Sequence, residues 1–235
     1  MTFAVHHVAE VSLSVSPGPL AWEAGNAPAV AAHWQDRIAA NPTLFNGGIF
    51  VCEDLDTSGT TLQATCRPMR YATLAYWRHL GQPDLGFWSI FGAVILRGTD
   101  GGLLVGRMAR QNFTAGRVYF PGGLFDERDL SNDRLEANAC ILRECLEETG
   151  LAPPTISLAP GFLVYHDAHR VALTRRANLP GTATDAAAEI TRWLATQDEP
   201  ELAEIHPVYQ PADLAKLDAE PYAQALAESI FTDGG

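Results

Sequence analysis

The sequence predicts an α/β protein whose strands and helices alternate along the chain and pack in layers. Apolar segments with a strand-like pattern alternate with segments of helical periodicity, and turn residues separate the two kinds. The composition is globular, with 47% hydrophobic and 19% charged residues, and no repeat or low-complexity tract interrupts it. With 235 residues, the chain can form one large domain or one domain with a smaller appendage.

The N-terminal third of the chain has the elements of a small α/β unit. Residues 9–15 alternate apolar and polar side chains, which predicts a strand. Three further elements are expected, namely an alanine-rich helix over 29–40, a hairpin of strands 47–52 and 61–64, and a short helix over 74–80. The turn residues of 82–86 form the best candidate boundary. We therefore expect an N-terminal extension over residues 1–85 and a main domain over residues 86–235.

The main domain shows a clearer alternation of elements. Strands are predicted over 91–96, 103–108, 117–120, 155–165 and 170–174, and helices near 183–196 and 222–231. Between these elements, Ser131 or Asn132 can cap a helix that ends at Thr149, because Gly150 suits the position after a helix C-terminus. This helix contains the residues on which a functional prediction depends.

The charge and the cysteines of the chain exclude several classes of protein. A net charge of −12 repels a phosphate backbone and an anionic membrane surface, so we expect neither a nucleic-acid partner nor membrane association. The four cysteines lack CxxC spacing, and we find neither a signal peptide nor a membrane-spanning stretch. Reduced core cysteines in a cytoplasmic protein are the expectation. An acidic protein still binds small phosphates when metal ions neutralise the charge locally.

Three glutamates lie close together on the predicted helix. On a helix of 3.6 residues per turn, Glu144 is beside Glu147 and Glu148. A separate apolar stripe is expected to pack on the sheet, formed by Leu135, Ala139, Leu142 and Leu146. Binding of a hard cation such as Mg²⁺ offsets the repulsion between carboxylates. A solvated acidic face is the alternative for three glutamates alone, but a glycine turn at Gly123, directly after a predicted strand, favours a site.

The helix and the glycine turn together resemble the Nudix box. That pattern is a Gly, a Glu, and then Arg-Glu-apolar-x-Glu-Glu-x-Gly-apolar, and it is matched by Gly123 and by residues 143–151. The segment between Gly123 and Arg143 is longer than in the family, and no Glu occupies the first Glu position. Asp129 is the best substitute by its distance from Gly123, whereas Glu136 is the nearest by its distance from Arg143.

The resemblance implies an α/β/α sandwich with a mixed sheet, and a metal-dependent hydrolase of diphosphate linkages. It implies that Glu144, Glu147 and Glu148 are catalytic and hold Mg²⁺ or Mn²⁺. Arg143 would be catalytic by orienting the glutamates through a salt bridge. A general base is also required, and the candidates beyond the box are Glu189, Glu199, Glu201 and Glu204.

A second resemblance bears on the substrate. The segment 107–116, followed by residues 120–123 (Phe-Pro-Gly-Gly) and by the spaced Asp126 and Asp129, is similar to coenzyme-A-type Nudix diphosphatases. The Ser and His that many of those enzymes carry in this segment are replaced here, so the match is partial.

The same segment supplies the candidate substrate-binding residues. Arg107, Arg110 and Arg117 can bind phosphate oxygens through their guanidinium groups, and we assign this role first to Arg107 and Arg110. Gly122 and Gly123 are assigned to substrate binding because glycine lets the backbone approach a ligand closely. Four aromatic residues can stack on an adenine, although such residues more often belong to a core: Tyr71, Tyr76, Trp77 and Trp88.

Several substrates remain open at this point. Coenzyme A or an acyl derivative is slightly favoured, and ADP-ribose, a nucleotide sugar or a damaged nucleotide is the alternative. A non-catalytic regulatory module that binds nucleotides is the alternative from another class, and the complete glutamate cluster counts against it. The expected partner is a small nucleotide, and the N-terminal strands suit a homodimer interface.

Overall fold

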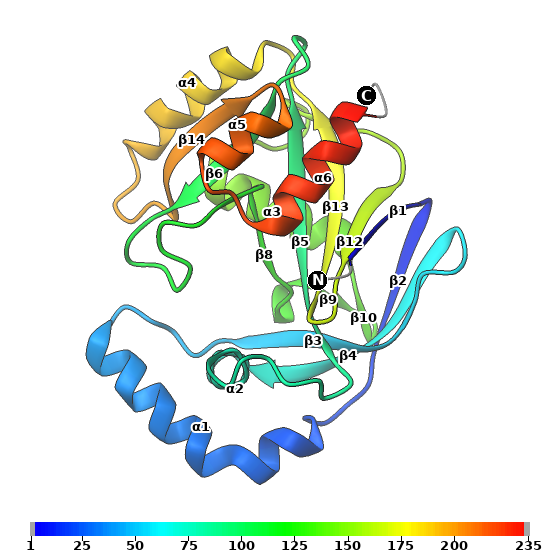
Figure 1. Cartoon of the computed structure of the whole chain (residues 1–235), viewed down its shortest axis with the longest axis vertical. Helices are drawn as coiled ribbons and strands as arrows, with labels where there is room; N and C mark the ends of the chain where they lie inside the picture. The colour runs from blue at the N-terminus through cyan, green and yellow to red at the C-terminus, as the bar shows by residue number, and fades with distance from the viewer. Residues whose placement is uncertain (1–2, 233–235) are drawn as a thin grey trace.

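The computed structural model describes residues 3–232 and shows a large mixed sheet with helices on its faces (Figure 1). Its main path runs, in spatial order, β1 (Ala4–Val8), β12 (Phe162–His166), β13 (Arg170–Asn178), β5 (Trp88–Arg97), β3 (Gly48–Asp56), β4 (Thr61–Arg70), β2 (Glu10–Val15), β10 (Arg134–Leu135) and β9 (Leu130–Ser131). Five further strands pair beside this path: β6 (Leu103–Met108), β7 (Val118–Tyr119), β8 (Gly122–Leu124), β11 (Ser157–Leu158) and β14 (Leu202–Val208). The pairs β13–β5 and β2–β4 are parallel and the other named pairs are antiparallel, which confirms the predicted α/β fold with a mixed sheet.

Helices cover both faces of the central strands. They are α1 (Ala21–Ala40), α2 (Tyr71–His79), α3 (Ala137–Thr149), α4 (Ala183–Leu194), α5 (Pro211–Lys216) and α6 (Pro221–Thr232), with a 3₁₀ turn at Glu127–Asp129. Along β5, Ile90 and Val94 pack in an apolar cluster with α3 and α4, whereas Ala93 and Ile95 pack in a second cluster with α5 and α6. Successive side chains of a strand point to opposite faces, so β5 is buried between two helical layers.

The N-terminal elements join the same sheet. Strand β1 pairs with β12, and β3 pairs with β5, so residues far apart in the sequence share backbone hydrogen bonds. Helix α2 packs on β3 and β4 through Leu74 and Trp77, and α1 packs on α2 and runs along the bottom of the molecule in Figure 1. Residues 82–86 connect α2 to β5. The division into residues 1–85 and 86–235 remains a prediction, as does the homodimer.

The predicted helix over residues 131–149 begins later than expected. Residues 130–135 form the hairpin of β9 and β10, and α3 starts at Ala137 with Glu136 before it. Asn132 and Asp133 both have positive φ, 48° and 58°, which suits a tight hairpin turn and is tolerated best by Asn, Asp and Gly. The hairpin then pairs with β2 through Leu135 and Leu13. The capping prediction for Ser131 or Asn132 was therefore wrong, because the same residue types also favour turns.

Most other elements occur where they were predicted, with longer ends. The segment 155–165, expected as one strand, is divided into β11 and β12, with Gly161 at φ 68° between them. Strand β14 and helix α5 were not predicted. Within residues 3–232, none of the helices combines the length and apolar character that crossing a membrane requires.

Candidate active site

Helix α3 places two of the three glutamates on its buried face. Glu144 and Glu148 are 8% and 1% exposed, and they share this face with Cys140, Ile141 and Cys145. The predicted apolar stripe was wrong, since Leu146 is 49% exposed and Ala139 is also exposed, while Leu135 lies in β10. The helix thus does not separate an apolar face from an acidic one.

The contact between α3 and β5 explains this orientation. A Cβ atom added to Gly92 of β5 would lie 2.9 Å from Cγ1 of Ile141 and 3.0 Å from Sγ of Cys140. Only a glycine therefore lets the helix lie this close to the strand. With Cys140 and Ile141 fixed on β5, the helical spacing carries Glu144 and Glu148 towards the neighbouring strand β8.

The glycine turn in β8 lies directly against these two carboxylates. The backbone N–H of Gly122 donates a hydrogen bond of 2.8 Å to Oε2 of Glu148. A Cβ atom on Gly123 would lie 2.5 Å from the carboxyl atoms of Glu144. The absence of side chains at both positions thus gives room to the carboxylates, and the predicted role of these glycines in substrate binding remains a prediction.

Asp129 is the partner of Arg143. The guanidinium group donates from Nη2 to Oδ2 over 2.8 Å and from Nε to Oδ1 over 3.1 Å, and Asp129 is only 2% exposed. The backbone N–H of Asp126 donates to the same carboxylate. The sequence expectation for Asp129 is confirmed, whereas Glu136 is the residue that precedes α3. The longer loop keeps the ion pair by folding into the 3₁₀ turn and the β9–β10 hairpin.

Two arginines also contact the glutamates directly. Nη1 of Arg143 lies 2.5 Å from Oε1 of Glu144 and 3.2 Å from Oε2 of Glu147. Nη1 of Arg128 lies 2.7 Å from Oε1 of Glu147. Glu148 forms no ion pair within residues 3–232, and its negative charge has other carboxylates as neighbours.

Burial and mutual repulsion raise the pKa values of this cluster. Burial raises the pKa of Glu144 to about 7, although the charge of Arg143 acts in the opposite direction. Burial raises the pKa of Glu148 well above its ordinary value, and the charges of Glu144 and Glu201 add to the effect. Glu201, at the start of β14, also has a raised pKa through burial and the charge of Glu147. Several carboxyl groups with raised pKa values that lie close together are typical of a functional site.

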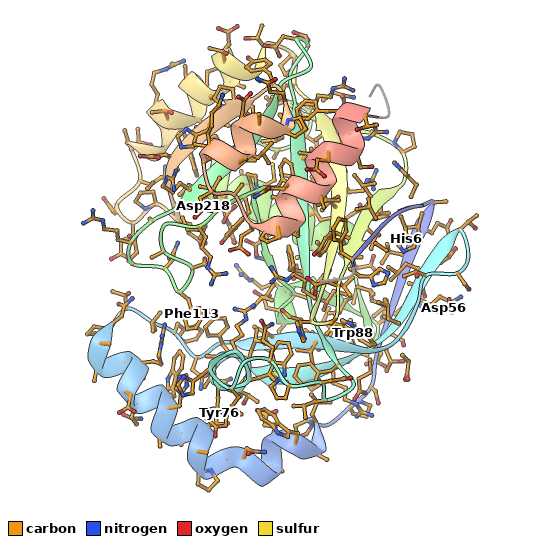
Figure 2. All side chains as sticks on the ribbon, in the orientation of Figure 1. His6, Asp56, Tyr76, Trp88, Phe113 and Asp218 are labelled. Carbon is orange, nitrogen blue, oxygen red and sulfur yellow. The ribbon has the colours of Figure 1, made fainter. Side chains whose placement is uncertain are left out.

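The glutamates face a cavity of about 510 Å³, which is in the usual range for small-molecule sites. Its carboxylate wall consists of Glu144, Glu147, Glu148 and Glu201. Aromatic residues line it as well, namely Tyr71, Phe91, Phe113, Tyr119 and Tyr222. Figure 2 shows Phe113 extending from the loop between β6 and β7 towards α1 and α2, and its ring centroid lies 5.2 Å from that of Tyr71. The N-terminal elements therefore help to enclose the cavity.

The arginines of the cavity are mostly not those expected from the sequence. Arg107 does not line it, because its guanidinium group donates to Glu204 over 2.9 Å and to the carbonyl of Gly116 over 3.0 Å. Arg110 is exposed and does not line it either. The arginines that do so are Arg78, Arg117, Arg128 and Arg170. Apart from Arg117, these arginines lie outside the glycine turn and the segment that precedes it, so no local sequence motif predicted them.

Of the aromatic candidates, Tyr71 alone lines the cavity. Trp77 is 1% exposed and packs with Phe87, and its indole N–H donates to the carbonyl of Pro83. Tyr76 stacks on Trp22 of α1, and Trp88 packs on the main apolar cluster (Figure 2). These residues confirm the core interpretation.

The chemistry of the carboxylate wall fits a divalent cation. Within residues 3–232, no three acidic, imidazole or thiol groups converge as a ready-made ligand set, since Arg143 and Arg128 hold Glu144 and Glu147. Glu148 is nevertheless buried without a counter-charge beside another buried carboxylate, which a cation would offset. An all-oxygen donor set suits Mg²⁺ or Mn²⁺.

The chain is similar to one known protein family and to several solved structures. Residues 87–228 match the family model of the NUDIX domain. A search of curated protein sequences found no match. Among solved structures, a MutT protein from Methanosarcina mazei Go1 is 17% identical, with a TM-score of 0.41, over 63% of this chain and 95% of that chain. A Nudix hydrolase from M. smegmatis, RenU, is 16% identical, with a TM-score of 0.43, over 63% of this chain and 89% of that chain.

A third similar structure is the NUDIX domain of NrtR from Shewanella oneidensis, which was crystallised with ADP-ribose. It is 13% identical, with a TM-score of 0.40, and the match covers 67% of this chain and 96% of that chain. The family-model match spans more than half of the chain. The chain therefore belongs to the NUDIX domain family and is a pyrophosphohydrolase of the Nudix type.

Proposed function

We propose that this protein hydrolyses the diphosphate linkage of a nucleoside diphosphate joined to another moiety, with Mg²⁺ or Mn²⁺ held by Glu144, Glu147 and Glu148. The observation that carries the proposal is the position of two buried carboxylates against a glycine turn at the wall of a cavity that arginines also line. Anionic and cationic side chains in one cavity suit a substrate whose phosphates bind both a metal ion and guanidinium groups.

The side chains of α3 have distinct roles in this proposal. A bound divalent cation would neutralise diphosphate charge and lower the pKa of a coordinated water. Glu144 and Glu148 provide carboxylate oxygens from the buried face, and Glu147 provides one from the exposed edge. Arg143, fixed by Asp129, holds Glu144 and Glu147 in place. Gly122 orients Glu148 through its backbone N–H.

Glu201 is the proposed general base, which accepts the proton of the attacking water. It lines the cavity, and its carboxylate is close enough to Glu147 for their charges to interact. The backbone carbonyl of Glu201 accepts hydrogen bonds of 2.9 Å from the N–H of Ala109 and the side chain of Asn112. These bonds fix the start of β14 to the loop that approaches the glycine turn. Glu189, Glu199 and Glu204 do not line the cavity.

Coenzyme A or an acyl derivative is the favoured substrate. The support is the resemblance of residues 107–129 to coenzyme-A-type enzymes, together with a cavity that adds arginines and aromatic rings to the carboxylate wall. Aromatic side chains such as Phe113 and Tyr119 suit stacking on a base. ADP-ribose and nucleotide sugars have the same diphosphate and remain the alternatives to be tested beside it.

The test is a turnover screen of the full chain against coenzyme A, ADP-ribose, a nucleotide sugar and a dinucleoside polyphosphate, with Mg²⁺, Mn²⁺ or EDTA. We expect metal-dependent release of a nucleoside monophosphate or its derivative, and loss of at least a hundredfold in turnover for Glu147→Gln. The matched control is Glu189→Gln, on the exposed face of α4. Binding of these nucleotides without turnover would instead support a regulatory module, and undiminished turnover by Glu147→Gln would refute the metal assignment.

A further inference from the structure

The cavity that the glutamates face is also lined by arginines from three distant segments. Arg78 comes from α2, Arg117 from the loop before β7, and Arg170 from the start of β13. The electrostatic neighbours of Arg78 include both Arg117 and Arg170. Three guanidinium groups are thus close enough to repel one another, which is unfavourable unless an anion lies between them.

The counter-charges of these arginines are incomplete. Glu220 lies 2.9 Å from Nη1 of Arg117 and 3.2 Å from Nη1 of Arg170. Asp167 pairs with Arg170 over 3.2 Å but does not line the cavity. Among the residues that the structure describes, no carboxylate forms an ion pair with Arg78. The Tyr71 hydroxyl interacts with Arg78, and burial lowers the pKa of Arg78, as do the charges of Arg170 and Arg117.

Two tyrosines that line the cavity have electrostatic neighbours in both the arginine group and the glutamate group. Burial and then the charge of Glu148 raise the pKa of Tyr119, while Arg78 acts on the same hydroxyl in the opposite direction. Tyr222 likewise interacts with both Glu148 and Arg170. Tyr119 is therefore near both Arg78 and Glu148, and Tyr222 is near both Arg170 and Glu148. Within residues 3–232, none of these three arginines forms an ion pair with Glu144, Glu147 or Glu148.

We propose that Arg78, Arg117 and Arg170 bind a phosphate monoester that the substrate carries in addition to the diphosphate linkage. These three arginines and their two paired carboxylates, Glu220 and Asp167, leave a net charge of +1, and Arg78 is the arginine without a paired carboxylate among the described residues. A phosphate monoester carries about −1.5 to −2 at neutral pH and three acceptor oxygens, so this group of guanidinium donors binds it more strongly than a single carboxylate. The inference rests on the proposed function and specifies the class of its substrate.

The position of Arg78 distinguishes a ligand-binding role from a structural one. A partly desolvated guanidinium group without a carboxylate partner does not favour folding. The neighbouring Trp77 and Leu74, both fully buried, are the residues that fix α2 on the sheet. Replacing Arg78 by Gln should therefore leave thermal stability unchanged or raise it, while a structural arginine would show a loss.

The test measures binding calorimetrically, which requires no turnover. Adenosine 3′,5′-bisphosphate, adenosine 2′,5′-bisphosphate and adenosine 5′-monophosphate are titrated into the full chain and into Arg78→Gln. We expect at least one bisphosphate to bind tenfold or more tightly than the monophosphate, and Arg78→Gln to remove that difference. Arg78→Lys should retain part of it, and Arg192→Gln, an exposed arginine of α4, should retain all of it.

Two results would overturn the proposal. One is equal affinity of the unchanged chain for the monophosphate and both bisphosphates. The other is a loss in Arg78→Gln that is as large for the monophosphate as for the bisphosphates, or that accompanies a melting temperature several degrees lower. Turnover of coenzyme A and of 3′-dephospho-coenzyme A then separates this inference from the proposed function. Failure to hydrolyse either substrate would count against the proposed function for coenzyme A, while the binding difference would still stand.

Discussion

Replacing Glu144 by Gln should stabilise the metal-free protein at neutral and higher pH. Glu144 is 8% exposed, and burial raises its pKa from 4.5 to about 7 despite the opposing charge of Arg143. Each pKa unit is worth about 1.4 kcal/mol, so the folded protein disfavours the charged carboxylate by roughly 3 kcal/mol. Gln has the same size and no charge, but it binds Arg143 less strongly. We therefore expect a gain in unfolding free energy of roughly 1–3 kcal/mol.

The pH dependence of this gain has a definite sign. Below pH 4.5 the carboxyl is protonated in both the folded and the unfolded chain, so Glu144 and Gln are nearly equivalent. Between pH 4.5 and about 7 the folded state holds more protons at this position than the unfolded state, and the stability of the unchanged chain falls as pH rises. Above about pH 7 the full difference between the two chains is present.

The assay is thermal unfolding in EDTA at pH 5 and pH 8, since 1 kcal/mol shifts the melting temperature of a chain this size by about 2–4 °C. We expect the Glu144→Gln variant to melt several degrees above the unchanged chain at pH 8 and at nearly the same temperature at pH 5. Added Mg²⁺ should raise the melting temperature of the unchanged chain more than that of the variant. A variant that is less stable at pH 8 would show that the Arg143 ion pair outweighs the cost of burial.

Three further substitutions test other contacts of the site. Asp129→Asn removes the most buried of the three carboxylates that pair with Arg143 and leaves Glu144 and Glu147, so urea denaturation should show a loss of about 1.5–3 kcal/mol, and a loss below about 1 kcal/mol would contradict the structural role. Gly123→Ala adds a Cβ atom 2.5 Å from the carboxyl atoms of Glu144 and should lower turnover at least tenfold. Gly25→Ala, where a Cβ meets open space, is its control, and equal turnover by both variants would refute the contact. Glu201→Gln should lower kcat and remove the acidic limb of the pH–rate profile, whereas an unchanged profile would exclude Glu201 as the base.

The sequence predicted part of the local geometry of the candidate site. The spacing of Glu144, Glu147 and Glu148 on a helix, and the position of Gly123 before it, follow from short-range rules of periodicity and turn formation. Asp129 could be identified as the partner of Arg143 by its distance along the chain, because a longer loop can still return a side chain to the same place.

The failures have two physical causes. Some residue types favour more than one local structure, and the prediction chose the wrong one. Asn132, for example, forms a hairpin turn and does not cap a helix. The second cause is tertiary packing. The buried face of α3 depends on Gly92 in another strand, and Arg78 and Arg170 reach the cavity through the pairing of β3 with β5 and of β13 with β5. No periodicity within a single element contains that information.

A titration of the full chain with Mn²⁺, followed by the electron paramagnetic resonance signal of the free ion, tests most directly whether the glutamates of α3 hold a divalent cation. We predict binding to the unchanged chain and to Glu189→Gln, and affinity at least tenfold lower for Glu147→Gln and for Glu148→Gln, because each change removes a carboxylate from the oxygen ligands. Binding of Mn²⁺ to both of these variants with the affinity of the unchanged chain would contradict the account.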